Sequence, residues 1–219
     1  MLLVLLLQLA ATSADTLVIR RATTPPVFDG RADSVEYGSP TAIITKPGGV
    51  VRLWLRRSGE SVYLAAELDD SSFYWGDDLV IGLDTGGDRA STPQHDDFQW
   101  YLRRVTDSSI VYRGRNGTWE APRDDPDWRL GSERTGGGWE LRSVSDSSRW
   151  SLELRLDGEW FAGESGHAPG FTVRTYDDAP HGWFVWPERA ALKHPTELER
   201  RPDLWGTVVE GPPGPGTGH

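Results

Sequence analysis

The sequence predicts an all-β fold, a two-sheet antiparallel β-sandwich, and three observations lead to this class. Apolar residues occur in short runs that are separated by Gly, Pro, Asp and Ser, as strands are separated by turns. No stretch keeps the helical period of about 3.6 residues over three turns. In the run 51–56, Val51, Leu53 and Leu55 fall on one face, whereas Trp54 and the two arginines fall on the other.

The same pattern defines the strands in order along the chain. Each run is short and ends near turn residues, such as Lys-Pro-Gly-Gly at 46–49 and Ser-Gly-Glu at 58–60. The number and spacing of the runs are typical of two packed sheets. The expected strands are Leu17–Arg20, Ala42–Thr45, Val50–Arg56, Ser61–Leu68, Leu79–Leu83, Asp97–Arg104, Ile110–Arg113, Trp139–Val144, Trp150–Leu156, Phe171–Tyr176, Gly182–Trp186 and Trp205–Val209.

The 219 residues are expected to form one domain over residues 15–211. Residues 1–14 are an apolar run that ends in small residues, which is the pattern of a secretory signal peptide. This run is too short to span a bilayer, so we expect a secreted or periplasmic protein without membrane insertion. Residues 212–219 are rich in Gly and Pro and are expected to be a disordered tail.

Composition limits the partners. The formal net charge of −10 argues against nucleic acid and anionic lipid, because both would be repelled. The chain has no cysteine, so it has neither disulfides nor thiolate chemistry. Its 11 tryptophans exceed what packing usually demands of one domain, which suggests that some of them face a ligand.

One segment, 73–84, carries most of the functional information. Three aromatic residues, Phe73-Tyr74-Trp75, lead into a strand that is bounded by aspartates. An Asp-Gly-x-x-Asp motif at 29–33 precedes it, and the segments 97–100, 170–173 and 204–206 follow. In order and spacing, these motifs resemble the family 9 carbohydrate-binding modules and their DOMON-like relatives over roughly residues 24 to 210.

The resemblance implies non-catalytic binding of a saccharide or glycan end in a slot walled by two tryptophans, because pyranose rings stack on aromatic planes. Trp75 matches the first wall. This chain has Ile81 and Tyr101 where the family has a glutamate and an arginine, and no tryptophan at 196–203, where the second wall should lie. The expected site residues are therefore Trp75, Gln99, Tyr101, Arg103, and Trp183 or Trp186 as the replacement wall. Such modules often accompany a catalytic or outer-membrane protein, which makes such a protein a candidate partner.

Other functions have weaker support. Asp84-Thr85-Gly86 looks like half of an aspartic protease site, but the second such motif, needed for a carboxylate pair, is absent. Haem, which DOMON-like relatives bind, would need two of four histidines, and no cofactor of this kind is expected. The main competitor is a cell-surface structural or protein-interaction sandwich that has lost sugar binding. The four histidines that precede the expected tail are His95, His167, His181 and His194.

Several acidic pairs raise the question of calcium, which takes six to eight oxygen ligands. No EF-hand spacing is present. Solvated loop carboxylates are an alternative explanation for the same pairs. If the chain holds a structural ion, the sequence points to calcium near Asp69, Asp70 and Asp97.

Overall fold

The computed structural model describes residues 15–70, 78–104, 109–121, 138–163, 166–178, 181–188 and 200–212. Within these ranges the chain forms 13 strands and a few short helical turns. Every run expected from the sequence is a strand, with ends that differ by at most two residues, but the short strand β8 was not expected. The elements are β1 (Thr16–Arg21), α1 (Ser34–Tyr37), β2 (Ala42–Lys46), β3 (Gly49–Ser58), β4 (Ser61–Asp69), β5 (Asp78–Asp84), β6 (Asp97–Arg103), β7 (Ile110–Arg115), β8 (Thr118–Glu120), β9 (Trp139–Ser145), β10 (Arg149–Asp157), η3 (Gly158–Phe161), β11 (Gly170–Asp178), β12 (His181–Trp186), η5 (Pro202–Leu204) and β13 (Gly206–Glu210).

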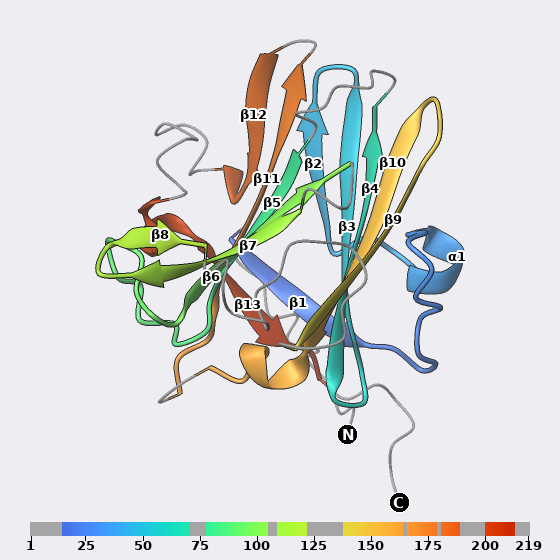
Figure 1. The fold of residues 1–219 in the computed structure, drawn as a ribbon. Coiled ribbons are helices and arrows are strands. Elements are labelled where there is room, and N and C mark those ends of the chain that lie inside the picture. The colour runs from blue at the N-terminus through green and yellow to red at the C-terminus, as the bar shows by residue number, and fades with distance from the viewer. Residues whose placement is uncertain are drawn as a thin grey trace, which may run out of the picture.

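The strands form one curled sheet whose two halves face each other, which is the expected sandwich (Figure 1). We call sheet A the half that contains β8, β7, β6, β5, β11, β12 and β13, and sheet B the half that contains β2, β3, β4, β10 and β9. Strand β1 joins them, because its first residues pair with β13 and its last two pair with β3. Both of these pairings are parallel, whereas the others are antiparallel as expected. None of the described helices is long and apolar enough to cross a membrane.

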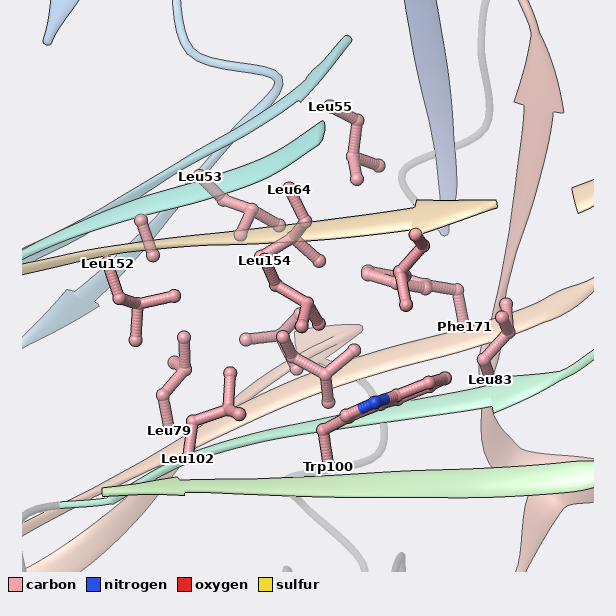
Figure 2. Packing of buried hydrophobic residues seen from close by; sticks show 14 of the residues in the cluster. Leu53, Leu55, Leu64, Leu79, Leu83, Trp100, Leu102, Leu152, Leu154 and Phe171 are labelled. Carbon is pink, nitrogen blue, oxygen red and sulfur yellow. The ribbon is translucent and has the colours of Figure 1, made fainter. Parts of the chain in front are cut away.

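The core lies between the two sheets and is built by alternate residues of each strand. Figure 2 shows leucines of β3, β4 and β10 facing leucines, Trp100 and Phe171 of β5, β6 and β11. Val51, Leu53 and Leu55 are fully buried in this core, as the alternation of 51–56 predicts. Burial of each such side chain stabilises the fold by about 1.5–3 kcal/mol.

The segment before β2 covers the outer face of sheet B, meaning the face turned away from the core. Its Asp-Gly-x-x-Asp motif is structural: Asp33 caps α1 by accepting the backbone N–H groups of Val35 and Glu36. The backbone N–H groups of Asp29 and Gly30 donate to Glu153 Oε2 of β10 at 2.7 and 2.6 Å. A small second core forms here from Phe28, Ala32, Tyr37, Trp54, Tyr63 and Ala65.

Glu153 is fully buried, and it also accepts a hydrogen bond from the hydroxyl of Tyr37. Burial raises the pKa of Glu153, partly offset by these hydrogen bonds, and the charge of Glu36 adds to the increase. A carboxyl whose pKa is raised by folding favours the folded state most at low pH and loses that contribution as pH rises through the folded pKa.

We therefore expect the stability advantage of the native chain over Glu153→Gln to shrink as pH rises above the ordinary glutamate pKa of 4.5. Glutamine keeps the size of the side chain and an acceptor oxygen but has no titrating proton. Urea denaturation of both proteins across this range measures the difference directly. A difference that stays constant, or grows with pH, would contradict the assignment.

Candidate functional site

The outer face of sheet A carries most of the residues that the sequence assigned to a binding site. On β6, Gln99, Tyr101 and Arg103 alternate with core residues, so the three share this face as expected. Gln99 is buried, whereas Tyr101 and Arg103 are partly exposed. Only the Tyr101 and Arg103 end of β6 therefore offers polar groups directly to a ligand.

Trp205 covers the middle of this face. Its ring lies over Gly82 of β5, the register partner of Gln99, so closely that a Cβ on Gly82 would be 2.8 Å from the indole. Trp205 also stacks on Trp119 of β8, with ring centroids 6.3 Å apart and planes at 6°. Val185 and Leu204 complete this cover. These side chains cover the half of the outer face that contains Gly82 and Gln99, which explains why Gln99 is buried.

The other half of the face holds a cluster that we call the Arg174 patch: the partly exposed Tyr101, Arg103 and Trp183, together with the buried Asp78 and Arg174. Val80 of β5 lies at its centre, because its register partners are Tyr101 on β6 and Arg174 on β11. The guanidinium of Arg174 lies 4.6 Å from the Trp183 ring and 5.9 Å from the Tyr101 ring. Three strands and β12 thus bring five polar and aromatic side chains together.

Charges within the Arg174 patch are closely coupled. Arg103 Nε lies 3.5 Å from Asp78 Oδ1, and its guanidinium also lies 5.8 Å from the Tyr101 ring. Burial, with the charge of Asp78, raises the pKa of Tyr101 to about 12, so its hydroxyl keeps its proton at neutral pH. Burial lowers the pKa of Arg174 to about 10, which still leaves it a cation. The patch therefore exposes the Arg103 guanidinium and the Tyr101 hydroxyl beside an aromatic ring, with Asp78 and Arg174 buried next to them.

The two tryptophans expected as the replacement wall lie on opposite faces of β12. Trp183 pairs with Tyr176 on the outer face, where the two ring centroids are 5.2 Å apart, and it is partly exposed. Trp186 instead belongs to the core and packs against Phe171. Strand alternation causes this separation. Only Trp183 can serve as a wall beside Tyr101 and Arg103.

Two other residues from the family resemblance have different outcomes. Trp75 lies outside the described residues, three positions before Asp78. Ile81, counted as the replacement for the family's glutamate, points into the core. Its neighbour Val80 occupies the outer face instead, so the patch has an apolar residue at its centre.

The structure does not bring Asp69, Asp70 and Asp97 together. Asp69 contacts Arg52 at 3.1 Å, and Asp70 lies 3.5 Å from Arg104, directly after the end of β6. Although burial acts to raise the pKa of Asp69, its hydrogen bonds from Arg52 and the Val50 amide lower it overall. Asp97 begins β6, so the strand's length of about 20 Å separates it from the Asp70 end. These three residues cannot share one ion.

Sequence reasoning missed Arg174 and Tyr176. In β11, Phe171 and Val173 lie in the core, so alternation places Thr172, Arg174 and Tyr176 on the outer face. The available signal was the position of Arg174 in a predicted strand, directly after the apolar residue Val173. Arg174 contacts Trp183 because β11 and β12 are consecutive strands that pair in an antiparallel hairpin.

Two hollows lie elsewhere on the described surface. One, of about 220 Å³, lies on sheet B and is lined mainly by charged and small side chains, including Arg31, Asp33, Glu67 and Arg149, without an aromatic ring. The other, of about 350 Å³, contains Phe98 and Trp160. These two rings pack on each other at 4.7 Å, and Trp160 also packs on Trp100 at 5.3 Å, so they belong to the edge of the core.

Comparison with solved structures shows that this fold is similar to that of family 9 carbohydrate-binding modules. A family 9 carbohydrate-binding module from Caldicellulosiruptor kristjanssonii, solved with cellotriose, superposes with a TM-score of 0.56 and 15% sequence identity, over 93% of this chain and 97% of that one. A structure of a family 9 module from the same organism with glucose gives a TM-score of 0.54 at 15% identity, over 92% and 98% of the two chains. No family model and no curated protein matches the sequence. The chain has the family 9 carbohydrate-binding module fold.

Proposed function

We propose that this chain is a non-catalytic module that binds a saccharide or glycan end at the Arg174 patch. The observation that carries the proposal is the position of Trp183. Its partly exposed ring stands beside fixed charged and hydroxyl groups on an outer sheet face. The fold supports the same function, because structures with this architecture were solved with cellotriose and with glucose.

The chemistry of the patch suits a pyranose. The C–H face of a sugar ring can pack on the Trp183 indole, while the hydroxyls at its edge meet the partly exposed Arg103 and the Tyr101 hydroxyl. Arginine donates in a planar fork, so it can bind two vicinal hydroxyls, and the buried Asp78 lies beside Arg103 at 3.5 Å. The guanidinium of Arg174 lies over the Trp183 ring, and this cation–π contact stabilises the orientation of the indole.

Trp75 is proposed as the second wall of the same slot, on the basis of the family resemblance and its place three residues before Asp78. The apolar run at residues 1–14 supports a secreted or periplasmic location, where glycans are available. A catalytic or outer-membrane protein remains the proposed companion of the module.

The hollow with Trp160 is the rival position for a sugar. Its two rings pack on each other and on the core, and the guanidinium of Arg113 lies 5.3 Å from the Phe98 ring. Among its described lining residues, Glu159 is the one carboxylate. The rival function is a protein-interaction sandwich. The cover formed by Trp205 and Trp119 favours this alternative, since it fills half of the outer face with apolar side chains.

Titration calorimetry and tryptophan fluorescence with glucose, cellotriose and a wider glycan panel test the proposal. We expect saturable binding of at least one saccharide, and no change in the oligosaccharide after long incubation with the protein. A complete lack of saturable binding across the panel would favour the interaction sandwich. Release of shorter products would overturn the assignment as non-catalytic.

A further inference from the structure

The accessible charge in the Arg174 patch is a cation. The side chain of Arg103 is 33% exposed, whereas that of Asp78 is 9% exposed and Arg174 is 1% exposed. Tyr101 and Trp183, the other two members of the patch, are partly exposed but carry no charge at neutral pH. Among these five side chains, a ligand therefore meets a guanidinium and no equally exposed carboxylate.

The charges within the patch do not cancel. Its members include two guanidiniums, those of Arg103 and Arg174, and one carboxylate, that of Asp78. Asp78 Oδ1 lies 3.5 Å from Arg103 Nε, which is longer than the roughly 2.7–2.9 Å of a strong charge-assisted hydrogen bond. Burial lowers the pKa of Arg174 and the charge of Asp78 acts to raise it, so this one carboxylate serves both guanidiniums. The five members sum to one positive charge, although the whole chain has a formal charge of −10.

The guanidinium of Arg103 is suited to a carboxylate ligand. Arginine has five N–H donors in a planar fork and no acceptor, which matches the two oxygens of a carboxylate. Such charge-assisted bonds are roughly twice as strong as those to a neutral hydroxyl. The fork lies 5.8 Å from the Tyr101 ring, and the backbone N–H of Arg103 donates to the buried Ser109 Oγ at 3.0 Å. These contacts hold Arg103 at one side of the patch.

We propose that the saccharide bound at the Arg174 patch is acidic, a pyranose that carries a carboxylate as in a hexuronic acid, and that Arg103 selects it. This inference rests on the proposed function. The C–H face of the ring packs on Trp183, and the carboxylate, in place of the hydroxymethyl group of a hexose, pairs with the Arg103 fork. The charge of the ligand balances the patch. Because this pair is partly buried, salt screens it less than it screens the repulsion from distant acidic side chains.

Calorimetry of the full chain with matched ligands tests this inference. The methyl glycosides of glucose and glucuronic acid differ only at C6, so their affinities isolate the carboxylate. We expect the glucuronide to bind roughly tenfold more tightly, since it gains a charge-assisted pair. The methyl ester of the glucuronide keeps the shape of the group without its charge, and it should bind about as the glucoside does. Galactose and galacturonic acid repeat the comparison with the other epimer.

Arg103→Gln should remove this preference. We expect it to weaken binding of the glucuronide at least about tenfold and binding of the glucoside only about twofold to threefold, because only the glucuronide loses an ion pair. Arg103→Lys keeps the charge without the planar fork and should keep part of the preference. Arg115→Gln is the matched control, because it removes the same charge from a side chain that is 70% exposed and lies 3.5 Å from Glu120, outside the patch. It should keep the full preference.

The outcomes separate this inference from the function on which it rests. Equal affinity for the glucoside and the glucuronide would overturn the acidic ligand, while binding of the glucoside would still support a saccharide module. A preference that falls equally in Arg103→Gln and Arg115→Gln would overturn the role of Arg103. Tighter binding of glucose 6-sulfate than of the glucuronide would overturn the choice of a carboxylate. If no saccharide binds, acidic ones included, the proposed function itself is refuted.

Discussion

Trp183→Ala is expected to weaken saccharide binding roughly 30-fold, equivalent to about 2 kcal/mol, while the protein remains folded. The indole provides the aromatic plane on which the sugar packs, and alanine leaves the hydroxyl-binding groups without it. Trp183 belongs to the outer face and not to the core between the sheets, so its loss opens no cavity there. Calorimetry with the best saccharide of the panel measures the change.

Trp119→Ala provides the control for this experiment. Trp119 is also a half-buried tryptophan of the outer face of sheet A, but it stacks on Trp205 in the covered half. We expect it to keep saccharide affinity within about twofold, and Trp183→Phe to keep part of it, because phenylalanine retains a flat ring. Equal losses in Trp119→Ala and Trp183→Ala, or full affinity in Trp183→Ala, would remove Trp183 from the site.

Trp100→Ala is expected to destabilise the protein by about 3–5 kcal/mol, which is the usual cost of a large cavity in a packed core. Trp100 is fully buried in sheet A and faces the leucines of sheet B (Figure 2). It packs against Phe98 and Trp160, with ring centroids 6.1 and 5.3 Å away. Urea denaturation measures the loss as a lower midpoint with a similar slope.

Trp100→Phe separates ring packing from the indole N–H. Among the described residues, Trp100 Nε1 has no hydrogen-bond partner, so removing this group sacrifices no hydrogen bond. We expect Trp100→Phe to cost less than half as much as Trp100→Ala. If the two variants were equally destabilised, the indole N–H would have a role that this arrangement does not show.

Most of the fold could be predicted from local sequence because each strand has two faces with different neighbours. The alternation of 51–56 places Val51, Leu53 and Leu55 in the core and Trp54 in the second core, and both faces are as expected. Strand β8 has three residues and none in the core, so it left no periodic signal. The parallel pairing of β1 with β13 joins residues nearly two hundred positions apart, and a local alternation pattern gives no information on such a pairing.

The candidate site could be predicted only in part, for the same reason. Gln99, Tyr101 and Arg103 share a face because they alternate on one strand. The burial of Gln99 could not be predicted, because it depends on Trp205 crossing from the end of the chain to lie over Gly82. The separation of Trp183 from Trp186 follows from their odd spacing and could have been read from the sequence.

A crystal structure of the chain with cellotriose tests the central claim most directly, because it locates the sugar. The result predicted here is a pyranose ring packed on Trp183, with its hydroxyls within hydrogen-bond distance of Arg103 and the Tyr101 hydroxyl. A sugar bound in the hollow beside Trp160, or on sheet B, with the Arg174 patch free of ligand, would contradict the account.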